Sequence, residues 1–172
     1  LYCAPLAIMA VADTGAALVG QEYGETRFKV LDGERSFEGS ATFFGLSFGI
    51  MLLGLTLAQR PGWPEMLLVA LVVSILATAV EAVSVRGSDN LLIPYTAWLV
   101  LERTFRLGLD ELSGWILGML LALGVVVATF KRARLTGAGA LLTFVMATLT
   151  YALGGAPWLL PLALLYALFV VV

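Results

Sequence analysis

The chain has 172 residues, of which 60% are hydrophobic and 13% are charged, and its formal net charge is -2. Soluble domains carry about 25% charged residues, so this composition indicates a membrane protein, and the small net charge gives no indication of a nucleic-acid partner. The chain has no histidine and one cysteine, Cys3. These counts exclude a Ser-His-Asp triad, a histidine-ligated zinc, a histidine general base and an internal disulfide within this chain.

Long hydrophobic runs alternate with short polar gaps along the chain, and each run is close to the roughly 17 to 25 residues that a membrane-spanning helix needs. We therefore expect an all-α fold, a polytopic transmembrane helical bundle of about seven spans. The expected spans are about 1–20, 39–58, 63–85, 91–107, 112–131, 136–153 and 156–172. A seam near residue 131 divides the chain into a membrane domain at 1–130 and further transmembrane helices at 131–172.

Alternating spans place the polar gaps at 21–38, 86–90 and 131–135 on one face of the membrane. This face carries seven basic residues, namely Arg27, Lys29, Arg35, Arg86, Lys131, Arg132 and Arg134. The opposite face carries three, namely Arg60, Arg103 and Arg106. By the positive-inside rule the first face is expected in the cytoplasm, so the chain is predicted to be a multi-pass protein with its unusual polar residues on the cytoplasmic face.

Asp13 lies inside the first expected span. Ala16, Gly20 and Gly24 follow it at helical spacing and share its face. Small residues at intervals of four allow close approach of a neighbouring helix, so we expect Asp13 to point into the bundle. A carboxylate there costs several kcal/mol unless it is paired or bound to a cation, which makes Asp13 a candidate functional residue. The alternative is a hydrated carboxylate at a helix end.

Three cations, Arg27, Lys29 and Arg35, precede the start of the second helix. Free backbone N–H groups at a helix start, with cations beside them, suit a phosphate group, although cations in this gap also serve membrane topology. Glu38 favours the dipole of the helix that it begins. Together with Asp13 it is a candidate ligand of Mg²⁺, which takes one or two carboxylates along with nucleotide phosphates.

Two further acids lie near the end of the third span and the start of the fourth. Glu81 is about one turn inside the hydrophobic run and needs a partner such as Arg86 or a metal ion. Asp89 is either the N-cap of the fourth helix or part of a site. The alternating topology gathers four acids at one membrane face as a candidate site for Mg²⁺ and a triphosphate, namely Asp13, Glu38, Glu81 and Asp89.

Two other patterns are assigned no chemistry. Gly45-Leu-Ser47-Phe-Gly49 fits the nucleophile pattern of serine hydrolases, but it lies in the middle of an expected span and the chain has no histidine base. Arg103 and Arg106 lie near Asp110 and Glu111 on the opposite face. We interpret them as exposed ion pairs of a solvated loop, which contribute little to stability.

The residues named above resemble a known signature. Asp13, Ala16, Gly20 and Gly24, followed by Arg35-Ser36-Phe37-Glu38-Gly39, resemble the CTP-binding signature of dolichol, phytol and farnesol kinases and of phosphatidate cytidylyltransferases. Glu81 with Asp89-Asn90-Leu-Leu-Ile-Pro94 is similar to the second motif of the phytol kinase branch. The chain departs from the pattern at Ala12, where glycine is frequent, and at Glu34, where the first of two lysines is frequent. Residues 135–140 and 154–158 faintly resemble a second membrane family that includes phytyl-phosphate kinases.

The resemblance implies a membrane kinase that transfers the γ-phosphate of CTP, or of another nucleotide, to an isoprenoid alcohol such as phytol, farnesol or dolichol, with Mg²⁺ bound. It implies that Asp13, Glu38 and Asp89 are catalytic and that the metal ligands come from Asp13, Glu38, Glu81 and Asp89. The implied nucleotide-binding residues are Gly20, Gly24, Lys29, Arg35, Ser36, Gly39 and Asn90. The alcohol would lie in the bilayer, among membrane lipid.

Three alternatives remain open from the sequence. A phosphatidate cytidylyltransferase would use the same nucleotide signature to make a CDP-lipid. An ion-coupled transporter would use the intramembrane acids to bind its coupling ions. A purely structural bundle would be insensitive to the substitution Asp13→Asn.

Overall fold

The computed structural model describes residues 3–30, 33–59, 62–85, 87–132 and 135–171. These residues form seven helices and one small hairpin. The first helix, Cys3–Glu22, consists of α1 (Cys3–Ala7), a π-helical segment η1 (Ile8–Asp13) and α2 (Thr14–Glu22). The strands β1 (Arg27–Val30) and β2 (Gly33–Ser36) follow. The remaining helices are α3 (Phe37–Leu57), α4 (Trp63–Val83), α5 (Asp89–Thr104), α6 (Leu109–Thr129), α7 (Gly137–Gly154) and α8 (Ala156–Val171).

The prediction of a helical membrane bundle is confirmed. Five of the seven helices in the described part of the chain are long and apolar enough to cross a membrane. The other two, α5 and α8, have 16 residues each. At about 1.5 Å per residue, 16 residues span about 24 Å, which is less than the roughly 30 Å hydrocarbon core.

Helix α4 forms the centre of the bundle. It is hydrophobic on all sides, and 72% of an 18-residue stretch of it is buried inside the bundle. This burial is expected for a helix that packs against neighbours all round. It contacts α3, α5, α6 and α7. Phe144 and Val145 of α7 belong to the same core cluster as Val72 and Leu76 of α4, so the helices that follow residue 131 pack onto the same bundle as those before it.

The polar gap after the first helix contains structure that the sequence interpretation did not include. We expected a loop there, but β1 and β2 form an antiparallel hairpin in which Arg27 pairs with Ser36 and Val30 pairs with Gly33. Gly33 has φ +109°, a conformation that favours glycine. An Asp-Gly pair at 32–33 in the sequence is a frequent hairpin signal. The fold is therefore all-α apart from this hairpin.

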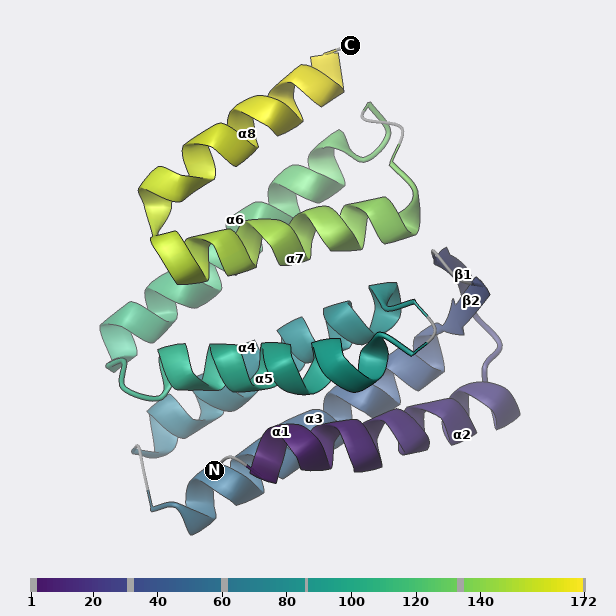
Figure 1. The fold of residues 1–172 in the computed structure, drawn as a ribbon, viewed down its shortest axis with the longest axis vertical. Coiled ribbons are helices and arrows are strands. Elements are labelled where there is room, and N and C mark those ends of the chain that lie inside the picture. The colour runs from purple at the N-terminus through teal and green to yellow at the C-terminus, as the bar shows by residue number, and fades with distance from the viewer. Residues whose placement is uncertain (1–2, 31–32, 60–61, 86, 133–134, 172) are drawn as a thin grey trace.

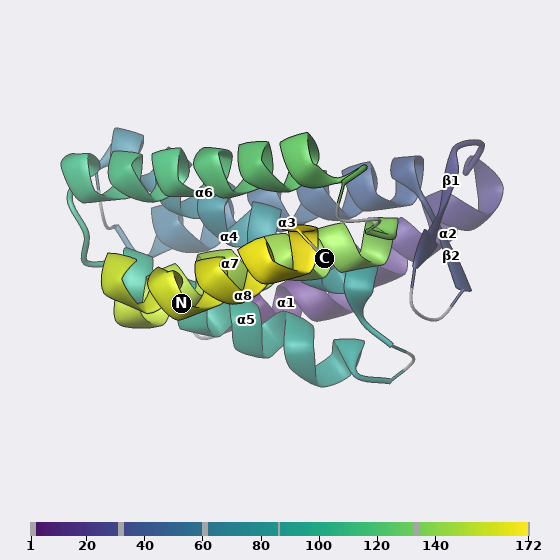
Figure 2. The same cartoon turned by 90° about the horizontal axis from the view of Figure 1, so that it is seen from above.

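The hairpin lies at one end of the bundle, beside the end of α2 and the start of α3 (Figure 1). The α4–α5 and α6–α7 connections lie at the same end, and the view from above agrees (Figure 2). Strand β1 also contacts α7, where a Cβ on Gly137 would lie 3.6 Å from the backbone oxygen of Lys29. The three gaps predicted to share one face therefore do so, although Arg86 and Arg134 lie outside the described residues.

Candidate functional site

The crossing of α2 and α3 explains the glycines that the sequence singled out. A Cβ on Gly20 would lie 2.8 Å from Ser36 Oγ, and one on Gly24 would lie 2.2 Å from the backbone oxygen of Gly20. A Cβ on Gly39 would lie 3.0 Å from the backbone oxygen of Ala16. No side chain fits at these positions. Gly20 and Gly39 allow the two helix backbones to approach each other, as the spacing of small residues predicted, and Gly24 lies just after the end of α2, against Gly20 and Ser36. A contact of Gly20, Gly24 or Gly39 with a nucleotide stays a prediction.

Ser36 connects the hairpin to α3. It is the last residue of β2 and the N-cap of α3, and its Oγ accepts a hydrogen bond of 3.0 Å from the backbone N–H of Gly39. Ser36 is buried between α2 and α3. This cap fixes the direction in which α3 leaves the hairpin, and it therefore also fixes the position of Arg35, the residue before it.

Arg35 and Glu81 form an ion pair across the bundle. Arg35 Nη1 lies 3.0 Å from Glu81 Oε1, and the Glu81 side chain is only 4% exposed, while that of Arg35 is 33% exposed. The expected partner of Glu81, Arg86, lies outside the described residues. A buried carboxylate without a partner is costly, so Arg35 compensates the charge of Glu81, and Glu81 in turn holds the guanidinium in a fixed orientation.

Asp13 and Asp89 are close enough to this ion pair to interact with it electrostatically. The Asp13 carboxylate interacts electrostatically with both Asp89 and Arg35, and Glu81 interacts with Arg35, Asp13 and Asp89. The structure thus brings together residues from the first helix, the hairpin, α4 and α5. We refer to Asp13, Arg35, Glu81 and Asp89 as the charged cluster.

Asp89 is not the N-cap of its helix. The N-cap of α5 is Ser88, whose side chain forms no capping hydrogen bond, and Asp89 is the first helical residue. Its Oδ1 accepts a hydrogen bond of 2.9 Å from the backbone N–H of Asn90. A carboxylate in the first turn is favoured by the helix dipole. Among the described residues, the other Asp89 oxygen accepts no hydrogen bond, so it can take part in the charged cluster. The Asn90 side chain is exposed.

Glu38 lies at the junction of the hairpin and α3. It is in the first turn of α3, and its Oε1 accepts a hydrogen bond of 3.2 Å from the backbone N–H of Thr26, just before the hairpin. Its Oε2 is buried without a hydrogen-bond partner among the described residues. Glu38 therefore ties the chain before β1 to the start of α3, and its metal-binding and catalytic roles stay predictions.

A small polar pocket of about 200 Å³ lies between α2, the hairpin, α3 and α4. We call it the hairpin pocket. Its walls include five residues that the sequence had singled out, namely Gly20, Arg35, Ser36, Gly39 and Glu81. Lys29 is exposed on β1 and is not among the residues that line it. The pocket joins the charged cluster through Arg35 and Glu81.

Four polar residues of the hairpin pocket were not among the predicted site residues. They are Gln21, Arg27, Glu34 and Ser40. Ser40 Oγ is buried and has no hydrogen-bond partner among the described residues. Arg27 reaches the pocket because the hairpin pairs it with Ser36, the residue before α3. Reading the gap as a loop concealed that pairing.

The acids do not form a ready-made metal cage. Among the described residues, no group of three or more Asp, Glu, Cys or His side chains is arranged to hold a metal ion. The charged cluster nevertheless contains three carboxylates and one guanidinium. Mg²⁺ is usually bound by one or two carboxylates together with substrate phosphates, so the donor set fits that mode of binding and does not fit a closed protein cage.

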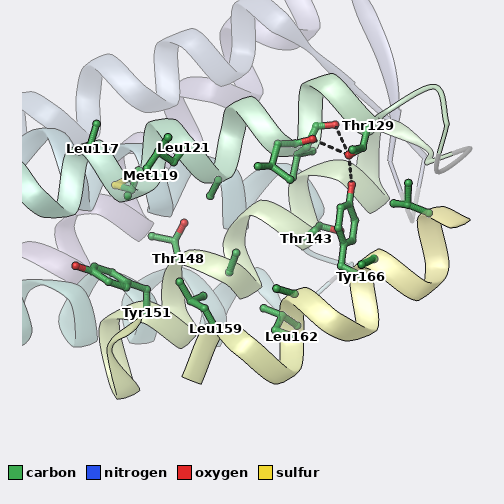
Figure 3. Close-up of a pocket in the computed structure, with 18 of the residues that line it drawn as sticks. Leu117, Met119, Leu121, Thr129, Thr143, Thr148, Tyr151, Leu159, Leu162 and Tyr166 are labelled. Atoms are coloured by element: carbon green, nitrogen blue, oxygen red, sulfur yellow. Dashed lines mark hydrogen bonds between the residues drawn. The ribbon is translucent and has the colours of Figure 1, made fainter. Parts of the chain in front are cut away.

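A second cavity of about 700 Å³ lies between α6, α7 and α8. Figure 3 shows Tyr151 toward one end of it and Thr129 with Tyr166 toward the other, where the two hydroxyl groups form a hydrogen bond. No charged side chain is among the residues that line it. This cavity is therefore an apolar groove of the helix bundle, separate from the charged cluster.

Comparison with known proteins connects the chain to one characterised activity. A segment of 94 residues is 35% identical to a phytol kinase from Synechocystis sp.. The similarity supports a distant relation to the prenol kinases. The matched segment covers 54% of this chain and 40% of the length of that relative. No protein-family model matches the chain, and no solved structure matches it.

Proposed function

We propose that this chain is part of a membrane kinase that transfers the γ-phosphate of CTP, or of another nucleoside triphosphate, to the hydroxyl group of an isoprenoid alcohol. The observation that carries the proposal is the charged cluster, in which Asp13, Glu81 and Asp89 meet Arg35 at the hairpin end of the bundle. The similarity to a phytol kinase supports the choice of reaction.

In this proposal the hairpin pocket receives phosphate groups. Arg35 and Arg27 supply two guanidinium groups, which suit phosphate oxygens because they donate several hydrogen bonds in a fixed plane. The pocket volume of about 200 Å³ is below the roughly 300–1,000 Å³ of sites that enclose a whole small ligand. We therefore assign the phosphate end of the nucleotide to this pocket and leave the base and ribose outside it.

Asp13 and Asp89 would hold Mg²⁺ together with the phosphates, because their carboxylates lie near each other and only one guanidinium offsets the three acids of the cluster. When bound, Mg²⁺ would supply neutralisation of the phosphate charge. Glu81 is assigned to orienting Arg35, since the two form an ion pair and Glu81 is almost fully buried.

The reaction itself requires mainly positioning and charge neutralisation, so the absence of histidine from the sequence is no obstacle. The alcohol oxygen attacks the γ-phosphorus, and the bond from that phosphorus to the oxygen bridging the β- and γ-phosphates breaks. The nucleoside diphosphate leaves with the bridging oxygen. The hydroxyl proton passes to a carboxylate of the cluster, and the isoprenoid chain remains in the bilayer.

We also assign the hairpin end of the bundle to the cytoplasm. The three connections at this end carry seven of the ten basic residues in the sequence, and the positive-inside rule relates such an excess to the cytoplasmic side. Cytoplasmic nucleotides would then have direct access to the hairpin pocket.

The decisive experiment uses the full-length protein in lipid vesicles, with CTP labelled at either the α- or the γ-phosphate. Geranylgeraniol, phytol and phosphatidic acid are offered as acceptors. The proposal expects γ-label, and no α-label, in a phosphorylated alcohol. Transfer of α-label to phosphatidic acid would establish a cytidylyltransferase, and absence of any transfer, together with ion-driven uptake into the vesicles, would establish a transporter.

A further inference from the structure

The first helix contains a π-helical segment, η1, that ends at Asp13. A π turn closes its hydrogen bonds one residue later than an α turn, so it accommodates one extra residue. Such turns are rare in proteins, and those that occur are often at functional sites. Here the segment is followed directly by α2, and Thr14 Oγ1 donates a hydrogen bond of 2.7 Å to the backbone oxygen of Ala10 inside it.

The extra residue changes the direction in which Asp13 points. Ile8 is fully buried and marks the side of the helix that faces the core. In a regular α-helix each residue advances by about 100°, so Asp13 would lie about 140° from Ile8, toward the outside of the bundle. When the π turn absorbs one residue, the separation falls to about 40°. Asp13 is then on the same side of the helix as Ile8.

The same extra residue allows a long buried face. Ala4, Ile8, Ala12 and Ala16 are all buried, although they recur every four residues. In a regular α-helix such a series drifts by about 40° per step and by about 120° from first to last. With one residue absorbed, the total drift is about 20°, so all four positions remain on the core side.

The two halves of the helix differ in their packing partners. Segments α1 and η1 contact α5, which begins with Asp89, as well as α3. Segment α2 packs on α3 through Gly20. If this sequence formed a regular α-helix throughout, only one of the two halves could keep its contacts, because the other half would be rotated away from its partners. The π turn allows both halves to keep their contacts.

We propose that η1 is a positioning element that sets the register between the two halves of the first helix, so that Asp13 faces Arg35 and Asp89 while both halves keep their contacts. The inference rests on the proposed function in one respect, namely that Asp13 acts in the reaction. The register itself is a property of the fold and is testable without activity.

The test compares two single-residue deletions in the full-length protein. Val11 lies in η1 and Leu18 lies in α2, and their side chains are 53% and 62% exposed, so neither deletion removes a core side chain. Deleting Val11 removes the extra residue and leaves a regular α-helix with Asp13 still about 40° from Ile8. Deleting Leu18 rotates Gly20 by about 100° relative to Asp13, because α2 is a regular α-helix with no extra residue of its own to give up.

We expect the Val11 deletion to keep the melting temperature of the parent protein in detergent and to lower kcat by less than about tenfold. We expect the Leu18 deletion to lower kcat by about 100-fold or more, because small displacements of positioned groups have effects of that size. Equal tolerance of the two deletions, or unfolding or inactivation by the Val11 deletion, would overturn the inference.

A second readout needs no activity. In a Cys3→Ser background, Asp13→Cys and Asp89→Cys are introduced together, and a short bifunctional thiol reagent is added. We expect the cross-link to form both in the parent length and after deletion of Val11. Its loss on deletion of Val11 would overturn the register claim. Cross-linking in both forms, together with absence of phosphate transfer by the protein that keeps Asp13 and Asp89, would refute the proposed function and leave the register claim standing.

Discussion

Arg35 on strand β2 lies 3.0 Å from Glu81 in the last turns of α4, and this ion pair joins the hairpin to the central helix of the bundle. The pair is asymmetric, because Glu81 is buried and Arg35 is partly open to the hairpin pocket. The Glu81 carboxylate is therefore available only to Arg35 and its other protein neighbours, whereas the Arg35 guanidinium has N–H groups that can bind a ligand in the pocket.

The ion pair leads to a prediction about stability. Replacing Arg35 by Met leaves Glu81 buried without its cation, and breaking a buried pair costs about 3–5 kcal/mol. Because Arg35 is 33% exposed, solvent screening reduces this cost, and we expect the free energy of unfolding to fall by about 1–3 kcal/mol. The double variant with Glu81→Gln should recover part of this loss. Chemical unfolding in mild detergent measures both, and a double variant less stable than Arg35→Met alone would contradict the assigned pairing.

The acids of the charged cluster lead to a prediction about catalysis. We expect Asp13→Asn and Asp89→Asn each to lower kcat by about 100-fold or more, since loss of a group that stabilises transferred charge has effects of this order. Each of the two variants should elute from a size-exclusion column at the same volume as the parent protein, which shows that it is folded. Asp110→Asn, in the exposed first turn of α6 at the other end of the bundle, is the matched control and should leave phosphate transfer unchanged. Wild-type rates in both cluster variants would remove these acids from the mechanism.

The hairpin pocket distinguishes two cations of β1, of which only Lys29 was predicted to bind the nucleotide. Arg27 lines the pocket and Lys29 does not, although both are exposed on β1. We expect Arg27→Ala to raise the KM for the nucleotide by about tenfold, which corresponds to one charge-assisted contact of about 1.4 kcal/mol. Lys29→Ala should change the KM by less than about threefold. The reverse order in steady-state kinetics would support the original sequence interpretation of Lys29.

Glu34 offers a gain-of-function test. It lines the hairpin pocket with Arg27 and Arg35, at the position where the resembled signature frequently has lysine. A carboxylate there repels phosphate, so Glu34→Lys is expected to lower the KM for the nucleotide by several-fold, and the gain should shrink in about 1 M salt because exposed charges are screened. Glu34→Gln is the neutral control and should fall between the two. An unchanged KM in both variants would place the phosphates elsewhere.

Gly24, which follows α2 and lies against the N-cap of α3, leads to a prediction about packing. Gly24→Ala would place a Cβ 2.2 Å from the backbone oxygen of Gly20 and 2.8 Å from Ser36 Cβ, whereas a Cβ on Gly49 meets nothing within 4 Å. We expect Gly24→Ala to destabilise the protein by about 1–3 kcal/mol, as is usual for overpacking, and Gly49→Ala to be neutral or slightly stabilising. Thermal unfolding of the two variants gives the comparison. Equal melting temperatures would show that the packing around Gly24 is looser than the structure indicates.

Much of the fold follows from hydrophobicity alone. Seven helical segments were expected from seven hydrophobic runs, because a run of that length has few other ways to satisfy its backbone in lipid. The same alternation placed the gaps at 21–38, 86–90 and 131–135 at one end. It thereby anticipated that Asp13 and Asp89 lie near each other, although the roles of the two acids stay predictions.

Other features depend on interactions that residue patterns encode weakly. A partner of Glu81 such as Arg86 or a metal ion was expected. Arg86 lies outside the described residues, and the hairpin brings Arg35 to Glu81, which the sequence interpretation did not include. The π turn at Ile8–Asp13 has no residue signature, because it arises from a mismatch between two packed halves of one helix. The hydrogen bond from Thr26 to Glu38 depends on the hairpin, which a loop interpretation could not supply, and the role of Glu38 beside Asp13 stays a prediction.

The central claim is that Asp13 and Asp89 jointly hold a divalent cation with the nucleotide phosphates. Electron paramagnetic resonance of Mn²⁺, titrated into the full-length protein with CTP, measures this directly. The account expects tight Mn²⁺ binding that requires CTP and is lost in both Asp13→Asn and Asp89→Asn, but not in Asp110→Asn. Binding of Mn²⁺ and CTP with wild-type affinity in either cluster variant would contradict it.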